Sequence, residues 1–177
     1  YEGGRESQLE ADAYSARGLV PASTALERSF RNVSLELPRF LPQSCTGCMD
    51  CVSICPDTAI WARVAEPAEL EVRLKKIERV DLREELHAGF ASTQKYDGGL
   101  FGLFIDVDKC KGCGECVTAC SAAKALEMVP KAALDLGSYD RGMDLFRHLP
   151  ETPARFLSQK SLGDMMLSSR AHLFTGG

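Results

Sequence analysis

The sequence lacks any apolar run that approaches the roughly 20 residues needed to cross a bilayer. Its N-terminal residues, Tyr-Glu-Gly-Gly-Arg, also lack the pattern of a secretory signal peptide. We therefore expect a soluble, cytoplasmic protein that has no membrane partner. The first residue is Tyr1 rather than Met, and the last two are Gly176 and Gly177, so we interpret the chain as a fragment of a longer polypeptide.

The sequence also lacks a stripe of basic residues. Its 21 Lys and Arg residues are scattered along the chain and are outnumbered by 25 Asp and Glu, which gives a net charge of −4. Proteins that bind nucleic acid concentrate positive charge on one face, so we expect no nucleic-acid partner. Apolar residues make up 45% and charged residues 26%, which indicates a globular chain with a real core. At 177 residues there is room for one ordinary domain and extensions.

Histidine is scarce, and its positions suggest no metal site. The three residues, His87, His148 and His172, show no spacing typical of ligands, so we interpret them as surface or capping residues.

Cysteine, by contrast, is plentiful and ordered. All eight cysteines fall in two blocks that both read C-x2-C-x2-C-x3-C. This run is typical of bacterial [4Fe–4S] ligation, in which the fourth cysteine of each block binds the other cluster. Three thiolates on a tight loop can reach three irons of one cubane, and we expect the fourth cysteine at the start of a helix, pointing to the neighbouring cluster. The predicted ligands are Cys45, Cys48, Cys51 and Cys120 for cluster I, and Cys110, Cys113, Cys116 and Cys55 for cluster II.

Two other interpretations of the cysteines were weighed. A disulfide framework suits short secreted chains, but this chain has no signal, and cysteines two residues apart are too crowded for four ordinary bridges. Structural zinc prefers two separated C-x2-C pairs, whereas each block here packs four cysteines together. No cysteine is left over, so nothing requires a catalytic thiol.

Glycines between the ligands fit a cluster loop. Gly47 and Gly112 directly precede the second ligand of each block, and Gly114 follows it in the second block. Glycine lets the backbone approach the inorganic sulfurs and donate N–H bonds, which would tune the reduction potential. The same glycines are also common in ordinary turns.

The two blocks form an internal repeat, because short apolar segments flank both. These segments predict four strands, at 39–41, 58–62, 103–107 and 125–129. The repeat predicts an α+β, bacterial two-[4Fe–4S] ferredoxin-like domain with pseudo-twofold symmetry.

The remaining segments extend this domain, which we place at 38–137. An insert at about 64–100 carries Leu70, Leu74 and Ile77 at amphipathic-helix spacing, and we expect this helix to pack over the clusters. Residues 95–102 are expected to form a turn back to the sheet. Trp61 is interpreted as a core residue near cluster II. The flanks cannot build a core alone, so they predict extended connecting arms at 1–37 and 138–177, the second leading toward a following domain.

With these motifs in view, the chain resembles the ferredoxin domain of pyruvate:ferredoxin oxidoreductase and related thiamine-dependent 2-oxoacid oxidoreductases. The resemblance runs from about Leu19 to Pro130 and includes the long insert and four segments in and around the cysteine motifs. One departure is Ser121 after the last ligand, where the family commonly has proline, as at Pro56. The segments are Leu37-Pro38-Arg39-Phe40-Leu41-Pro42, Cys51-Val52-Ser53-Ile54-Cys55-Pro56, Lys109-Cys110-Lys111-Gly112-Cys113-Gly114-Glu115-Cys116 and Ala123-Lys124-Ala125-Leu126-Glu127-Met128.

The resemblance implies an electron conduit within a larger, oligomeric enzyme. Thiamine diphosphate, Mg²⁺ and a further [4Fe–4S] cluster are then expected only outside this chain, and no catalytic residue is expected within it. Its partners would be other domains or subunits of the enzyme and an external ferredoxin or flavodoxin. The alternatives are an iron–sulfur subunit of a hydrogenase or formate-type complex, and a structural domain stapled by its clusters.

Overall fold

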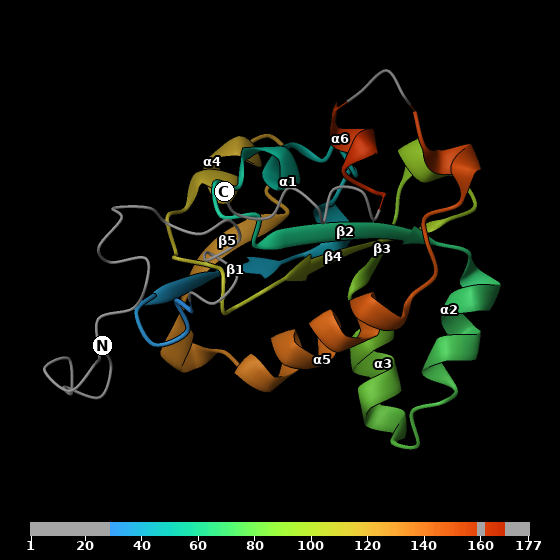
Figure 1. Ribbon diagram of the computed structural model, residues 1–177, viewed down its shortest axis with the longest axis horizontal. Helices are drawn as coiled ribbons and strands as arrows, with labels where there is room; N and C mark the ends of the chain where they lie inside the picture. Colours follow the sequence, from blue (N-terminus) through green and yellow to red (C-terminus); the bar gives the residue numbers. More distant parts are fainter. Residues whose placement is uncertain (1–28, 159–161, 169–177) are drawn as a thin grey trace, which may run out of the picture.

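The computed structural model describes residues 29–158 and 162–168, and it contains two antiparallel sheets (Figure 1). The first pairs β1 (Glu36–Phe40) with β5 (Leu126–Pro130). The second has the order β2-β4-β3, formed by β2 (Ile60–Ala65), β4 (Leu100–Ile105) and β3 (Phe90–Ser92). Each sheet thus joins a strand near one cysteine block to a strand near the other. The predicted mixture of helices and strands is confirmed.

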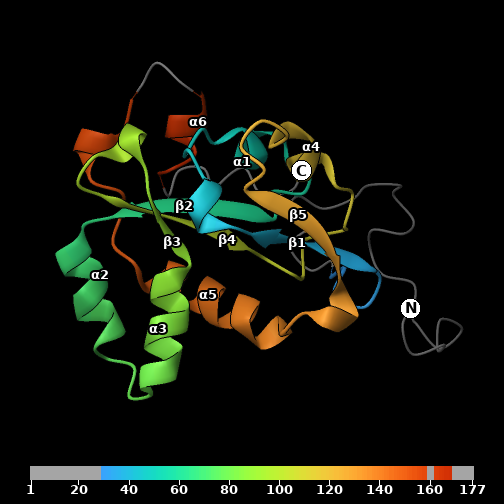
Figure 2. The same ribbon diagram turned by 180° about the vertical axis from the view of Figure 1, so that it is seen from behind.

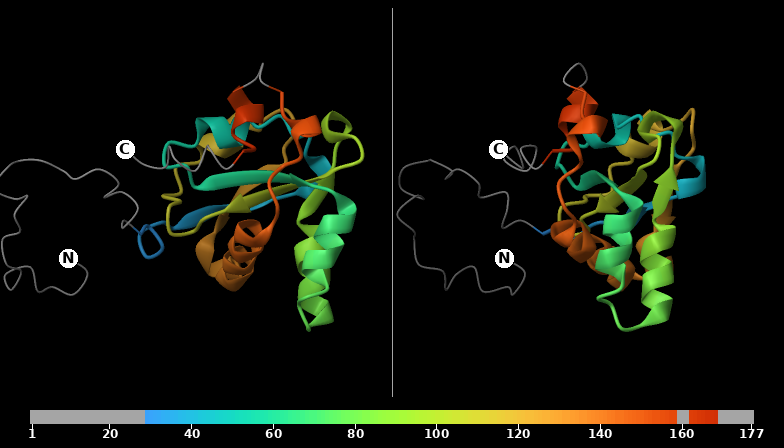
Figure 3. Two further views of the ribbon diagram at one scale, coloured as in Figure 1. Left: turned by 45° about the vertical axis from the view of Figure 1, so that its right-hand side comes forward. Right: turned by 90° about the vertical axis from the view of Figure 1, so that its right-hand side faces the viewer.

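The helices lie on two sides of the three-stranded sheet (Figures 1 and 3). On one side, α1 (Asp50–Ile54) and α4 (Glu115–Ala119) carry cysteines and contact each other. The other side is covered by longer helices. These are α2 (Pro67–Leu74), α3 (Val80–Ala88) and α5 (Leu136–His148).

Short segments complete the described chain, and among its helices none is long and apolar enough to cross a membrane. Four 3₁₀ helices link the larger elements, and α6 (Leu162–Met165) contacts α1. The 3₁₀ helices are η4 (Pro42–Ser44), η5 (Gln94–Tyr96), η6 (Lys131–Ala133) and η7 (Ala154–Phe156).

Alternation along the strands divides the apolar side chains into two cores. Along β4, Phe101, Leu103 and Ile105 point to the cysteines, whereas Phe104 points to α5. We call these the cysteine-side core and the helix-side core. The cysteine-side core includes Met49, Val52, Ile60, Ala62, Val64, Phe101, Leu103 and Ile105, and the helix-side core includes Trp61, Leu70, Leu74, Leu86, Phe90, Phe104, Met143, Phe146 and Leu149.

The insert lies elsewhere than predicted. Leu70 and Leu74 are buried in the helix-side core, on the face of the sheet that points away from the cysteines. The prediction that this helix packs over the clusters was therefore wrong, because periodicity identifies a buried stripe but not the surface that covers it. The last part of the insert, at Thr93 and Tyr96, reaches the first cysteine loop.

Most of helix α5 falls within the predicted arm 138–177, yet its apolar side packs on the sheet (Figure 2). Met143 and Phe146 are three residues apart, as are neighbours on one helix face, and both are buried. Asp135 caps the helix, since its side chain accepts a hydrogen bond from the N–H of Gly137 at 2.9 Å. This part of the arm therefore belongs to the packed body of the described chain.

The first predicted arm is mostly outside the described residues, but its end is tied to the domain. Arg31 lies 2.9 Å from Asp108 and 2.5 Å from Asp140, and these two carboxylates raise the pKa of its guanidinium. The side chain of Leu37 is fully buried.

Two further residue predictions can be compared with the fold. Trp61 is buried as expected; it packs against Phe146 in the helix-side core, and Nζ of Lys109, the residue before Cys110, lies 5.7 Å from its ring centroid. His87 and His148 are exposed, whereas His172 lies outside the described residues.

Candidate cluster-binding site

The two cysteine loops share one backbone conformation. Gly47 and Met49 in the first loop have φ of 71° and 76°, and Gly112 and Gly114 in the second have 73° and 79°. These left-handed residues occupy the same positions relative to the ligands. Alternating right- and left-handed residues turn successive N–H groups toward one concave side, which suits an anionic group. The sequence did not predict this conformation at Met49, because a left-handed backbone is usually indicated by glycine.

The cysteines line two small cavities. Three members of one block and the last member of the other meet at each cavity. The first is lined by Cys45, Cys48, Cys51 and Cys120, and the second by Cys55, Cys110, Cys113 and Cys116. The structure thus brings together the same cysteines that the spacing grouped.

The fourth cysteine of each block sits at the end of a helix, not at its start as predicted. Cys55 terminates α1 and Cys120 terminates α4. Each lies four residues beyond the third cysteine, which is about 6 Å further along the axis at 1.5 Å per residue. Because α1 and α4 contact each other, this advance carries each fourth thiol to the cavity of the opposite block.

Backbone N–H groups already point at the sulfurs. Ala59 donates to Cys55 Sγ at 3.2 Å, and Ala125 donates to Cys120 Sγ at 3.3 Å. Gly47 donates to Cys45 Sγ at 3.4 Å. Bonds of this kind stabilise thiolate charge and would also stabilise a reduced cluster.

Burial raises the pKa of four of the thiols. It raises the pKa of Cys45, Cys51 and Cys110, and it raises the pKa of Cys116 to about 12. Charge on neighbouring thiols adds to this effect: Cys120 raises the pKa of Cys51, and Cys55 raises that of Cys116. Iron must displace these protons, because metals bind the thiolate.

The donor set fits iron–sulfur clusters. In the described part of the chain, no three His, Cys, Asp or Glu side chains converge as they would around a metal ion. The thiols instead surround a cavity with almost entirely apolar walls, which suits a larger group that is held by sulfur at its corners. The second ligand of each block, Cys48 or Cys113, is exposed, so each cavity has one edge near the surface.

The surroundings of the two loops differ. Helix α6 packs against the first loop at Met49. The contact is so close that a Cβ placed on Gly163 would lie 2.7 Å from the Cβ of Met49. At the corresponding Gly114, nothing lies within 4 Å of such a Cβ.

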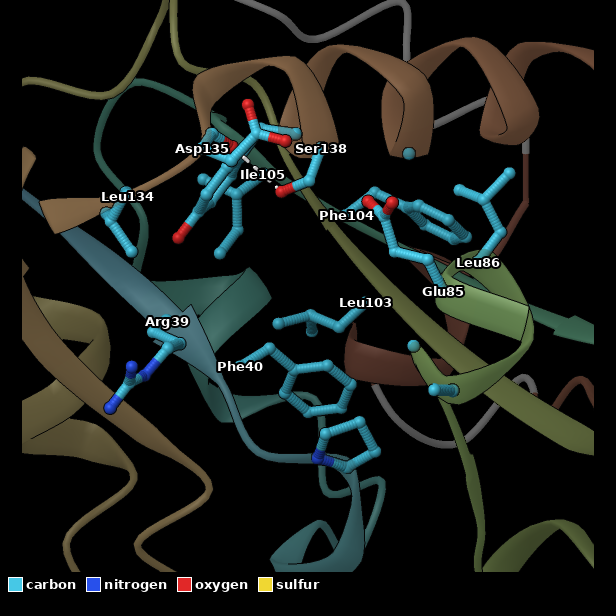
Figure 4. Close-up of a pocket in the computed structure, with 15 residues that line it drawn as sticks. Arg39, Phe40, Glu85, Leu86, Leu103, Phe104, Ile105, Leu134, Asp135 and Ser138 are labelled. Atoms are coloured by element: carbon cyan, nitrogen blue, oxygen red, sulfur yellow. Dashed lines mark hydrogen bonds between the residues drawn. The ribbon is translucent and has the colours of Figure 1, made fainter. Parts of the chain in front are cut away.

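A separate cavity lies between β1, β4, α3 and α5, and sequence analysis did not foresee it (Figure 4). Phe40 and Leu103 line both this cavity and the first cysteine cavity. Its charged groups are engaged in pairs: Glu85 and Asp135 each lie 2.9 Å from Arg141. We therefore assign it no catalytic role.

Comparison with known protein families places residues 44–124 in a 4Fe-4S dicluster domain. This range includes all eight cysteines.

Individual relatives agree with this family. The chain is 30% identical over 165 residues to a pyruvate-flavodoxin oxidoreductase of Nostoc sp., and 27% identical over 153 residues to the pyruvate:ferredoxin oxidoreductase of Moorella thermoacetica. These alignments cover 90% and 84% of this chain, but only 13% and 12% of the relatives. A pyruvate-flavodoxin oxidoreductase of Klebsiella pneumoniae is 35% identical over 63% of the chain and 8% of its own length. The chain spans about an eighth of the length of the first two relatives, and it is similar to a segment of these pyruvate-flavodoxin and pyruvate:ferredoxin oxidoreductases.

Proposed function

We propose that this chain is an electron-transfer module that holds two [4Fe–4S] clusters with crossed ligation. Cluster I would be bound by Cys45, Cys48, Cys51 and Cys120, and cluster II by Cys110, Cys113, Cys116 and Cys55. The observation that carries the proposal is the composition of the two cavities, each lined by three cysteines of one block and the fourth of the other.

The protein residues would supply ligands, hydrogen bonds and a low dielectric. When bound, a [4Fe–4S] cluster takes up and releases one electron, at a potential within a range of roughly −700 to +450 mV set by its surroundings. The amides of Ala59 and Ala125 would stabilise charge on the fourth ligand of each cluster. Contact between α1 and α4 keeps the two sites adjacent, which supports transfer from one cluster to the other.

We further propose that the module serves a pyruvate-type 2-oxoacid oxidoreductase and passes electrons from the decarboxylation site to ferredoxin or flavodoxin. Thiamine diphosphate, Mg²⁺ and a third cluster would lie outside the chain, in an oligomeric, cytoplasmic enzyme. The names and lengths of the relatives support this context. They do not favour a hydrogenase or formate-type subunit.

The domain organisation is part of the proposal. We propose a pseudo-twofold core at 38–137 with connecting arms at 1–37 and 138–177, the second of which includes most of α5, packed on the sheet. Support for the symmetry comes from the pairing of β1 with β5 and of β2 with β4.

The proposal is tested by anaerobic reduction of the chain with dithionite, followed by addition of oxidised ferredoxin or flavodoxin. We expect reversible bleaching that corresponds to two one-electron centres, and recovery of the oxidised spectrum when the carrier is added. Clusters that do not reduce reversibly would instead favour a structural, stapling role. In the complete enzyme, reduction by pyruvate would be the matching test, and reduction by hydrogen or formate alone would overturn the assignment to this family.

A further inference from the structure

A tyrosine side chain contacts the first cysteine loop at a position where the second loop has a backbone oxygen. Tyr96 reaches it from the end of the insert, and its hydroxyl donates a hydrogen bond to the carbonyl oxygen of Gly47 at 3.2 Å. The ring of Tyr96 lies so close that a Cβ on Gly47 would be 2.8 Å from its Cε2 atom. At Gly112, which has the corresponding place in the second loop, the nearest group is instead the backbone oxygen of Glu36, 2.7 Å from such a Cβ.

Tyr96 is held firmly in this position. Its side chain is 2% exposed, and its ring stacks on Phe101 with centroids 5.6 Å apart and an angle of 8° between the planes. Phe156 contacts the same ring edge-on, at 6.2 Å. The hydroxyl is therefore aimed at the loop by packing within the cysteine-side core, and its orientation does not depend on solvent.

The hydrogen bond acts on a peptide group that belongs to the cluster loop. The carbonyl of Gly47 and the N–H of Cys48 are parts of one peptide, and Cys48 lines the first cysteine cavity. Donation to the carbonyl polarises the peptide and makes its N–H more positive, because hydrogen bonds in a chain strengthen one another. Within a dry site, such a dipole stabilises added negative charge more strongly than it would in water. The backbone oxygen of Glu36 presents a dipole of opposite sign to the second loop.

We propose that Tyr96 is a positioning residue that raises the reduction potential of the cluster at Cys45, Cys48, Cys51 and Cys120, and so sets it apart from the cluster at the second block. This inference rests on the proposed function. Its hydroxyl donates to the carbonyl of Gly47, so Tyr96 acts through the peptide between Gly47 and Cys48.

The test compares the midpoint potentials of both clusters in the full chain and in the Tyr96→Phe variant, with the clusters distinguished by assigned cysteine β-proton resonances. Loss of the hydroxyl should lower the potential of cluster I and leave that of cluster II unchanged. We expect the reduced-to-oxidised ratio of cluster I at a fixed potential to fall about threefold, or roughly 30 mV at 59 mV per tenfold change. Tyr139→Phe is the control, because it removes a hydroxyl that donates to Pro38 at 3.0 Å, outside the first loop. It should leave the potential of cluster I unchanged.

A second variant keeps the test decisive if Tyr96→Phe fails to retain cluster I. Site-specific 3-fluorotyrosine at position 96 strengthens the donor, so it should raise the potential of cluster I. An unchanged potential in both variants, equal shifts in the two clusters, or shifts of opposite sign to these would overturn the inference. Failure of the proposed function is distinguishable, since it would appear as a wild-type chain that lacks two reversibly reduced clusters.

Discussion

The ammonium group of Lys111 lies 2.8 Å from Oδ2 of Asp57. The ion pair joins the two cysteine blocks, because Lys111 follows the first ligand of the second block and Asp57 follows the last ligand of the first. The bond to Asp57 raises the pKa of Lys111. Because both side chains are partly open to solvent, the ion pair contributes little to stability. Its significance is positional, since it keeps the end of α1 beside the second cysteine loop.

Crossed ligation leads to the first prediction. Cys55→Ala should damage cluster II and leave cluster I with four thiolates, whereas Cys120→Ala should damage cluster I. The reason is that each fourth thiol lines the cavity of the opposite block. EPR spectra of the reduced variants, with each cluster identified separately, would measure this. Damage confined to the mutated block would point to two locally ligated sites.

Metal content gives the second prediction. Two clusters require about eight iron and eight acid-labile sulfide per chain, which elemental and sulfide analysis of anaerobically purified protein would measure. About two zinc ions without sulfide would contradict the cluster interpretation. The Cys55→Ala variant is an internal control, because its iron content should fall while that of the wild type stays complete.

Two glycines beside Cys113 give the third prediction. Gly112 and Gly114 have similar φ, but a Cβ on Gly112 would lie 2.7 Å from the backbone oxygen of Glu36, whereas a Cβ on Gly114 meets nothing within 4 Å. Gly112→Ala should therefore lower the occupancy of cluster II severely. Gly114→Ala should cost only the backbone strain, on the order of 1 kcal/mol, and should retain the cluster.

Iron analysis and the thermal stability of these two variants measure the difference. Because Gly112 and Gly114 have similar φ, the comparison isolates the effect of the room available for a Cβ at each position. Equal losses in both variants would show that φ alone decides, and Met49, which has φ of 76° in the first loop, already argues against that outcome.

Removal of the clusters gives the fourth prediction. The cysteine-side core would lose its centre, but the helix-side core contains no cysteine. The single tryptophan, Trp61, lies in that second core and is 6% exposed. After anaerobic chelation we expect reduced helix content, while Trp61 keeps the blue-shifted emission of a buried indole. Emission shifted to that of denatured protein would show that the whole fold depends on metal.

The phenol of Tyr139 gives the fifth prediction. Burial raises its pKa to about 12 from an ordinary value of 10.0. In the unfolded chain the phenol ionises near pH 10, whereas in the folded chain it keeps its proton, so the free energy of unfolding should fall as pH rises from 10 to 12. Tyr139→Phe should cost about 1 kcal/mol at pH 7, because its bond to the Pro38 carbonyl is lost.

The advantage of the wild type over Tyr139→Phe should shrink across the same pH window, as measured by urea denaturation. A difference that stays constant between pH 10 and 12 would contradict the raised pKa. Phe substitution keeps the ring and its packing, so it isolates the hydroxyl.

The sequence predicted the parts of this site that depend on local spacing. Apolar residues beside the cysteine blocks located four of the five described strands with bounds off by up to three residues, whereas β3 was missed. The grouping of Cys120 with Cys45 followed from the repeated motif. The place of the insert was not predictable, because the stripe of Leu70 and Leu74 is equally suited to either face of a sheet. Helix α5 was missed because Met143 and Phe146 are interspersed with charged residues such as Asp144 and Arg147. The contact between Tyr96 and Gly47 joins residues 49 positions apart, and no local pattern encodes it.

The two-faced sheet has a consequence for how such a module can change over time. Substitutions behind β4, around Phe104 and Phe146, alter a surface that no cysteine touches, while those around Phe101 and Leu103 alter the lining of the metal sites. Substitutions at α2, α3 and α5 can thus accumulate in the helix-side core without changing the lining of the two cysteine cavities. The sheet acts as a partition that lets one side diversify while the other stays constant.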